Sequence, residues 1–296
     1  NFIFFDNIDE ENLKKIENLK KINQTLFIVI SKSGYTIETL LNFFLLKKIK
    51  KNSKNIIIIS EKNDNPLYVI AKKMNFYHIE HKKYITGRYS VLSEVGMLPA
   101  ELMGLNPNKF RQLNNLIKSK RFINNLVSNV SSMIIYSKNR KYNSIILNYN
   151  PNFENLLEWY KQLVSESLGK KGKGILPIIS NMPKDNHSLM QFYLDGPKKN
   201  FYTFFSVLAK NSNKINSKYL LKSHSYLKNK NLSKIISSQI MATQNIFKRK
   251  KIPFRSFEIL KRNEQSLGEI FCFFILETIL LGRALKVNPF DQPSVE

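Results

Sequence analysis

Short runs of hydrophobic residues alternate along the chain with longer amphipathic stretches, and this alternation predicts an α/β fold. The runs at 25–30 and 55–59 are apolar at nearly every position and are followed by serine. Such runs are typical of strands covered on both faces, as in a parallel sheet. The opening run at 1–5 is also expected to be a buried strand. Further strands are predicted at 75–79, 144–147, 174–179, 201–208 and 252–260.

The stretches between these runs predict crossover helices, and therefore doubly wound parallel sheets in three αβα layers. The polar turn Asn106-Pro107-Asn108 follows a predicted helix, so we expect two domains, 1–105 and 106–296. A segment rich in Lys, Asn and Ser, 210–231, is expected to be a surface loop or insertion. The predicted helices are 9–21, 36–50, 66–74, 91–103, 108–130, 153–165, 232–250 and 265–284.

Composition narrows the class of protein. A chain of 296 residues, 43% of them hydrophobic, is long enough for two packed cores. The single cysteine, Cys272, lies among phenylalanines and is expected to be a buried thiol, which suits a reducing cytoplasm. The most apolar stretch, 270–281, contains Glu277 and is too short to span a membrane. We therefore expect a cytoplasmic protein with no membrane partner.

The formal net charge of +25 raises the question of nucleic-acid binding. The lysines are mixed with Asn and Ile along the whole chain, as at 47–52 and 214–218, and form no compact basic stripe. This spread favours a solvated basic surface without a nucleic-acid partner, although the surface would still attract a phosphorylated anion. A nucleic-acid binder stays open as an alternative, and it would bind DNA or RNA in a salt-sensitive way.

The first candidate site separates a predicted strand from a predicted helix and reads Ser-Lys-Ser-Gly-Tyr-Thr-Ile-Glu-Thr at 31–39. Gly34 allows a tight turn, so that free N–H groups and the positive end of the helix dipole point at one spot. Each hydroxyl alone is more typical of a helix cap, but together with the glycine they favour a site for a phosphate monoester. The segment lacks the Gly-Lys-Ser/Thr ending of a nucleotide P-loop. Its hydroxyl groups belong to Ser31, Ser33, Thr36 and Thr39.

Two further candidate sites carry groups suited to proton transfer. Arg88 follows Gly87 at the entrance of a predicted helix, where a fixed cation can stabilise an oxyanion. Gln162 and Glu166 lie four residues apart and so share one face of a predicted helix that ends at Gly169. A carboxylate there can act as a base beside an amide donor. Taken singly, a Gly-Arg pair is more often an ordinary surface turn, and a glutamate at a helix end is more often simply exposed.

A loop histidine and the polar carboxyl-terminal segment complete the candidates. His187 lies in a loop, in the sequence Asp-Asn-His-Ser at the start of a predicted helix, and an imidazole there can exchange protons near neutral pH. His78, His81 and His224 are interpreted as structural or surface residues. After a long apolar helix, the segment 288–296 reads Asn-Pro-Phe-Asp-Gln-Pro-Ser-Val-Glu.

The order and spacing of these motifs resemble the phosphoglucose isomerase family. The resemblance implies two sugar-isomerase (SIS) domains, each a parallel sheet between helices, and an enzyme that interconverts glucose 6-phosphate and fructose 6-phosphate through a cis-enediol without a metal or nucleotide cofactor. It covers the chain from its first predicted strand to its last residue. The motifs that carry it are the serine-threonine loop, Gly-Arg-Tyr-Ser at 87–90, Gln-x-x-x-Glu-Ser-x-Gly-Lys at 162–170, Asn-His-Ser at 186–188, and the segment 288–296.

The resemblance also assigns roles to residues of this chain. Glu166 would move a proton between C2 and C1, and the Gly87 backbone and Arg88 would stabilise the enediolate charge. The residues that would clamp the phosphate are Ser31, Ser33, Thr36 and Thr39, with Lys32 in the same loop.

The remaining assignments concern the sugar. Gln162 and Gln292 would position its hydroxyl groups, and His187 would help open its ring. Because the family commonly takes this histidine from the neighbouring subunit, the resemblance implies a homodimer.

The chain departs from the family pattern at three positions. Thr86 stands where the family usually has glycine, and Tyr35 and Ser294 replace residues that are usually smaller or different. A glycine-serine loop of the family would precede position 1, and a ring-opening lysine would lie three residues beyond Glu296. We therefore expect these 296 residues to be part of a longer enzyme.

Two alternatives keep the same fold. A dual phosphoglucose/phosphomannose isomerase would act on mannose 6-phosphate as well. A non-catalytic SIS-domain regulator would need the serine-threonine loop but not Glu166.

Overall fold

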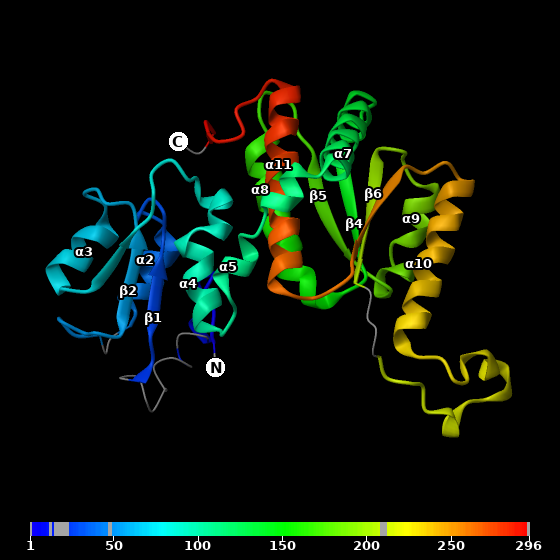
Figure 1. Cartoon of the computed structure of the whole chain (residues 1–296), viewed down its shortest axis with the longest axis horizontal. Helices are drawn as coiled ribbons and strands as arrows, with labels where there is room; N and C mark the ends of the chain where they lie inside the picture. Colours follow the sequence, from blue (N-terminus) through cyan, green and yellow to red (C-terminus); the bar gives the residue numbers. More distant parts are fainter. Residues whose placement is uncertain (1, 12–13, 15–23, 47–48, 208–211, 295–296) are drawn as a thin grey trace. The chain divides into compact units, whose positions relative to one another are not determined.

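The computed structural model describes residues 2–11, 14, 24–46, 49–207 and 212–294. The chain divides into two compact units, Asn1–Pro107 and Asn108–Glu296. The boundary expected at residue 105 lies inside the first of them. Each unit contains a parallel sheet with helices packed on it, which confirms the predicted fold class (Figure 1).

The first unit is built on the parallel strands β1 (Phe27–Ile30), β2 (Ile56–Ser60) and β3 (Tyr77–Glu80), in that order across the sheet. Helices α2 (Ile37–Phe44) and α3 (Pro66–Met74) pack their apolar residues against the sheet. The buried cluster that results comprises Val29, Leu40, Phe43, Ile56, Ile58, Leu67, Ala71 and Phe76.

Helix α3 begins and ends where its sequence provides caps. The Asn65 side chain accepts a hydrogen bond from the Tyr68 N–H, and Pro66 occupies the first turn, where its missing N–H costs nothing. Asn75 ends the helix in the left-handed region. The 3-10 helix η2 (Gly87–Leu92) and α4 (Glu94–Leu102) follow β3. Ser93 separates these two helices because its side chain caps α4, so the helix predicted from residue 91 begins later than expected.

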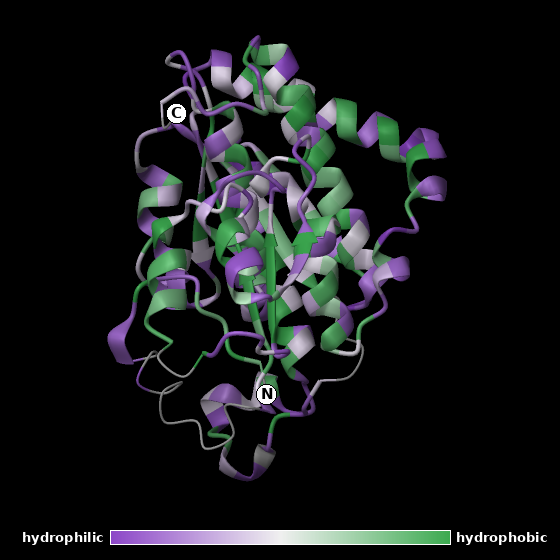
Figure 2. Ribbon diagram, turned by 90° about the vertical axis from the view of Figure 1, so that its left-hand side faces the viewer, coloured by the Kyte–Doolittle hydropathy of each residue, from purple (hydrophilic) through white to green (hydrophobic). Residues whose placement is uncertain are grey.

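The second unit has a four-stranded parallel sheet of order β5-β4-β6-β7. Figure 1 shows α7 (Lys120–Lys138), α8 (Glu154–Leu168) and α11 (Glu264–Leu285) on one side of this sheet, and α9 (Met190–Asp195) and α10 (Leu232–Arg249) on the other. The strands are mostly hydrophobic where the helices cover them (Figure 2). The strands are β4 (Asn143–Asn148), β5 (Leu176–Asn181), β6 (Asn200–Val207) and β7 (Phe254–Ile259).

Alternate residues of these strands face opposite layers, as the two-residue period of a strand requires. Ile145, Leu147, Tyr202 and Phe204 pack against Tyr193 of α9 and Phe247 of α10. On the other face, Arg255 of β7 donates hydrogen bonds to Thr203 of β6, Tyr160 of α8 and Glu277 of α11. Cys272 of α11 is a buried thiol, as predicted, and burial raises its pKa.

Two predicted elements of the first unit differ from the structure, and a third is mostly outside the described residues. Residues 2–6 form no strand, and Phe2, Ile3 and Phe4 are more than half exposed. No strand of the described sheets pairs with this run, and an apolar run without a ladder partner gains no strand hydrogen bonds. Of the helix predicted over 36–50, the described residues are helical only in α2, which ends at Phe44, and the Leu46 N–H then bonds to the Phe43 carbonyl in a tightened turn. Most of the helix expected over 9–21 falls outside the described residues.

The helix predicted over 108–130 is broken into α5 (Pro107–Phe110), α6 (Asn114–Lys118) and the start of α7. Ser119 causes the second break, because its extended backbone lets its hydroxyl cap the Phe122 N–H. The described part of 210–231 carries the 3-10 helices η5 (Ser217–Tyr219) and η6 (Lys222–Leu227) and is mostly exposed. Two other 3-10 helices, η3 (Pro151–Phe153) and η4 (Lys184–Asn186), follow β4 and β5. Across the described residues, no helix is both long and apolar enough to cross a bilayer.

Candidate active site

The loop after β1 is closed on itself by the buried hydroxyl of Ser31. Its Oγ accepts a hydrogen bond from the Gly34 N–H at 3.2 Å and lies 2.7 Å from Thr36 Oγ1. The Ser31 N–H donates to the Ile59 carbonyl at 3.1 Å, which continues the ladder between β1 and β2. The strand end, the turn and the start of α2 are therefore held together by one small side chain.

Gly34 is required at this turn for two reasons. Its φ is +71°, a left-handed conformation that favours glycine, and a Cβ there would lie 1.8 Å from Asn65 Oδ1. Asn65 cannot easily move away, because its Oδ1 accepts from the Tyr68 N–H at 2.9 Å and its Nδ2 donates to the Glu61 carbonyl at 2.7 Å. The cap of α3 thus packs against the loop that precedes α2.

The predicted phosphate hydroxyls are not equally available to a ligand. Ser33 and Thr36 are exposed, and Thr36 is the N-cap of α2 without using its side chain as a cap. Thr39 is directed back to the strand, where its Oγ1 donates to the Ile30 carbonyl at 3.4 Å. Since the first N–H groups of a helix have no partner inside it, an anion at this end would meet N–H donors beside Ser33 and Thr36. The Tyr35 side chain is 62% exposed.

Lys32 of the same loop forms an ion pair with Glu61, the residue that follows β2. Their Nζ and Oε1 atoms are 3.5 Å apart, and both side chains are partly exposed. The Glu61 N–H also donates to the Lys32 carbonyl at 2.9 Å. The ends of β1 and β2 therefore present a cation that is held in place but already shared with a carboxylate.

Gly87 and Arg88 begin the 3-10 helix η2 after β3. Arg88 is buried, and its guanidinium carbon lies 5.6 Å from the centre of the Tyr89 ring. A Cβ at Gly87 would meet no atom within 4 Å, so the backbone is open to close approach there. The Gly87 carbonyl accepts from Ser90 Oγ at 2.6 Å, which rigidifies the turn. Thr86, the departure from the family pattern, has a buried hydroxyl without a hydrogen-bond partner.

Gln162 and Glu166 lie one turn apart on α8, as predicted. The face of α8 that is turned to the core is fixed by fully buried apolar side chains, including Leu163, Val164 and Leu168. Gln162 is exposed and Glu166 half-buried. The helix ends at Leu168 with Gly169 as its C-cap, which also agrees with the sequence.

The segment that carries Gln292 is anchored next to the end of α8. Lys170 donates from Nζ to the carbonyls of Asn288 and Asp291, both at 2.5 Å, and to Asp291 Oδ1 at 2.6 Å. Gln292 follows directly and is partly buried. Lys170 stood inside a recognised motif, but no local pattern connects it to residues more than a hundred positions away, and we assigned it no role from the sequence.

His187 lies in the turn after β5 and is exposed. The turn is organised by Asp185, whose Oδ2 accepts from Ser180 Oγ at 2.9 Å and from the Asn181 N–H at 2.7 Å. Its Oδ1 accepts from Ser188 Oγ at 3.1 Å. The loop around the histidine is thus fixed by a neighbouring carboxylate while the imidazole faces solvent.

A buried charged cluster in the second unit was also missed from the sequence. Arg255 pairs with both carboxylate oxygens of Glu277 and donates to Tyr160 Oη at 3.1 Å, while Tyr160 donates to Glu277 Oε2 at 2.8 Å. Burial and the nearby carboxylate raise the pKa of Tyr160. Arg255 also donates to Thr203 at 3.0 Å and to Asn129 at 3.3 Å.

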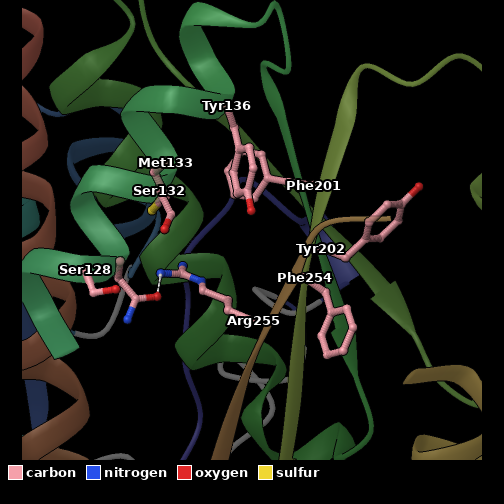
Figure 3. A pocket seen from close by; sticks show the side chains of 9 residues that line it. Ser128, Ser132, Met133, Tyr136, Phe201, Tyr202, Phe254 and Arg255 are labelled. Carbon is pink, nitrogen blue, oxygen red and sulfur yellow. Dashed lines mark hydrogen bonds between the residues drawn. The ribbon is translucent and has the colours of Figure 1, made fainter. Parts of the chain in front are cut away.

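A cavity of about 200 Å³ lies beside this cluster, between α7 and the first residues of β6 and β7 (Figure 3). Arg255 and the hydroxyl groups of Ser128 and Ser132 line it. The five N–H groups of a guanidinium are all engaged by the Arg255 partners described above, so this arginine has no donor left for an anion. The arrangement indicates a structural cluster. Among the residues that the structure describes, no group of three His, Cys, Asp or Glu side chains could hold a metal.

A parallel α/β fold with a hydroxyl-bearing loop between its first described strand and the following helix is typical of the class of proteins that bind phosphorylated small molecules. Comparisons with known proteins identify the family within this class. A family model described as phosphoglucose isomerase matches residues 1–251. The chain belongs to the phosphoglucose isomerase family.

Individual relatives agree with this membership. The chain is 33% identical to a probable glucose-6-phosphate isomerase of Methanococcus maripaludis, over 99% of this chain and 68% of the relative. It is 30% identical to the glucose-6-phosphate isomerase of Methanocaldococcus jannaschii, over 100% of this chain and 75% of the relative. The crystal structure of a glucose-6-phosphate isomerase from Chlamydia trachomatis has the same fold, with a TM-score of 0.76 at 18% identity over 98% of this chain and 60% of that one.

Proposed function

We propose that this chain catalyses the interconversion of glucose 6-phosphate and fructose 6-phosphate. The observation that carries the proposal is membership of the phosphoglucose isomerase family together with the half-buried Glu166 of α8, one turn from Gln162. Removing a carbon-bound proton requires a fixed base, and a carboxylate on a helix packed into the core is such a base. The resulting cis-enediolate would be stabilised by Arg88 and the open backbone at Gly87.

The serine-threonine loop would hold the phosphate group of the sugar. Support comes from the exposed hydroxyls of Ser33 and Thr36 at the start of α2 and from Lys32, whose ion pair with Glu61 fixes its ammonium group. Ser31 would act by closing the loop, and Thr39 would turn from the Ile30 carbonyl to reach the phosphate. Gln162 and Gln292 would position sugar hydroxyls, and His187 would assist ring opening.

We also propose that the protein acts as a homodimer in the cytoplasm. An exposed His187 in a turn fixed by Asp185 suits a histidine that is offered to a neighbouring subunit.

Proton transfer between C1 and C2 needs neither a metal nor a nucleotide. The proposed reaction can therefore run on side chains alone.

A coupled assay of glucose 6-phosphate formation from fructose 6-phosphate, with the natural full-length protein, tests the activity. Glu166→Gln keeps the size of the side chain and removes the base, so turnover should fall by at least about 100-fold. Glu158→Gln, on an exposed turn of the same helix, should keep wild-type turnover. Binding of the sugar phosphate without turnover in the wild-type protein would instead support the regulator, and comparable rates on mannose 6-phosphate would support the dual isomerase.

A further inference from the structure

The contact between the end of α8 and the carboxyl-terminal turn is made by one buried ammonium group. The Lys170 side chain is 6% exposed, and its Nζ has three acceptors: the carbonyls of Asn288 and Asp291 and the carboxylate of Asp291. A lysine ammonium has three protons, so every donor is used. A buried charge that is fully hydrogen-bonded holds its partners in one geometry, because moving any of them leaves a donor unsatisfied.

The turn that Lys170 contacts has its own fixed shape. Asn288 Oδ1 accepts from the Phe290 N–H at 3.0 Å, and Pro289 packs so closely against Gly282 of α11 that a Cβ there would lie 2.9 Å from the proline ring. The Val287 N–H donates to the Gly282 carbonyl at 2.9 Å, which ends α11. The turn is therefore attached on one side to α11 and on the other to Lys170.

The residues on either side of this contact are the assigned base and a residue assigned to the sugar. Glu166 lies in the last turn of α8, four residues before Lys170, and Gln292 follows Asp291 directly. We propose that Lys170 is a positioning residue that fixes Gln292 relative to Glu166 by clamping the 288–291 turn onto the end of α8. This inference rests on the proposed isomerase function. Lys170 itself touches no substrate in this account.

The ionisation and the burial of the Lys170–Asp291 pair both fit this role. Hydrogen bonding to Lys170 lowers the pKa of Asp291, so the carboxylate stays ionised at neutral pH. The Asp291 side chain is 40% exposed, whereas the lysine is enclosed. The lysine is thus the fixed member of the pair, and the turn is the segment that it holds.

Lys173 offers a matched control. It belongs to the same connection after α8 and donates from Nζ to the Leu285 carbonyl, at 2.9 Å, in the last turn of α11. It therefore contacts the same neighbourhood without touching the turn at 288–291. Lys173→Met makes the same substitution at a nearby lysine and should leave kcat/KM unchanged.

The test combines kinetics with hydrogen exchange on the natural full-length enzyme. Lys170→Met should lower kcat/KM by about 100-fold, in line with the cost of a misplaced substrate contact. If Lys170 acts through Gln292, the double variant Lys170→Met/Gln292→Ala should be no slower than the slower single variant. Additive losses in this cycle, or wild-type kinetics in Lys170→Met, would overturn the proposal.

Backbone exchange gives a readout that does not need activity. Lys170→Met should speed amide exchange at Phe290, Asp291 and Gln292, while Lys173→Met should not. Asp291→Ala, which leaves both carbonyl acceptors of Lys170 in place, should show a smaller change of the same kind if Lys170→Met does not fold. If the wild-type protein shows no isomerase activity but Lys170→Met still speeds exchange, the clamp is supported and the isomerase function is rejected. If neither Lys170→Met nor Asp291→Ala changes exchange, the clamp itself is rejected.

Discussion

The two units hold their candidate residues by different means. In the first, a glycine, backbone N–H groups and small hydroxyls shape the loop after β1, and the ion pair of this loop, Lys32–Glu61, is partly exposed. In the second, enclosed charges fix the elements: Lys170 anchors the carboxyl-terminal turn, and Arg255 with Glu277 joins β7 to α11. Loss of a buried partner leaves an uncompensated charge, whereas loss of a surface partner exposes a group to water. Stability should therefore be more sensitive to the loss of one of these enclosed charges in the second unit than to the loss of the Lys32–Glu61 pair in the first.

The largest expected effect is the loss of Glu277. It is fully buried and neutralises Arg255, so Glu277→Leu should lower the free energy of unfolding by about 3–5 kcal/mol. Urea denaturation followed by circular dichroism measures the change. The double variant Arg255→Met/Glu277→Leu removes both charges and should recover part of the loss. A single variant as stable as the wild type would show that the buried pair is not what stabilises this unit.

Gly34→Ala should have the next largest effect, and it falls in the first unit. The left-handed conformation alone costs about 1–2 kcal/mol for a residue with a Cβ, and displacement of Asn65 adds to it. Gly104 provides a control, because its φ is +83° but a Cβ there would meet nothing within 4 Å. Thermal denaturation should show a larger loss for Gly34→Ala than for Gly104→Ala, and KM for fructose 6-phosphate should rise only in the former. Equal losses would mean that the contact with Asn65 is unimportant.

Ser31→Ala and Ser33→Ala separate loop closure from ligand contact. Ser31 is buried and accepts from the Gly34 N–H, so its loss should cost about 1–3 kcal/mol of stability and raise KM. Ser33 is exposed, and its removal should change stability by less than about 0.5 kcal/mol while still raising KM. Chemical denaturation and initial-rate kinetics measure both. Equal stability of the two variants would contradict the closure role of Ser31.

The smallest expected effect concerns the pH dependence of stability through His78. Burial lowers the pKa of this imidazole below its usual 6.5, although its Nε2 lies 3.0 Å from Ser60 Oγ. Below pH 6.5 the unfolded chain therefore binds more protons than the folded one, and stability falls as the pH drops from 6.5 through the lowered folded pKa. His78→Phe cannot titrate, so its melting temperature should fall less between pH 7.5 and pH 5.5. Parallel curves for both proteins would rule out this contribution.

Much of the fold follows from local patterns. All seven strands of the described residues lie within two residues of their predicted bounds, and α3 covers the predicted 66–74 because Asn65 and Asn75 supply both caps. The predictions that were wrong depend on context. Ser119, within a helical pattern, is the N-cap of α7, and the apolar run at 2–5 has no partner in the described sheets.

The site was less accessible to sequence reasoning than the fold. Motifs indicated which residues matter, and their assigned roles stay predictions. The sequence could not show that Thr39 donates to the Ile30 carbonyl, or that Lys170 contacts Asp291, because both depend on where the chain returns in space. The partner of Glu277 could not be predicted for the same reason, because a single acid in an apolar helix does not indicate that Arg255 lies beside it.

The most direct test of the central claim follows hydrogen at carbon during turnover in D₂O. A base that takes the proton from C2 or C1 onto a carboxylate exposes it to exchange, so product formed over many turnovers should carry solvent deuterium on carbon. Mass spectrometry should detect this label with the wild-type enzyme and with Glu158→Gln, and lose it with Glu166→Gln. Sugar phosphates interconverted without any solvent deuterium on carbon, or labelling that persists in Glu166→Gln, would contradict proton transfer by Glu166.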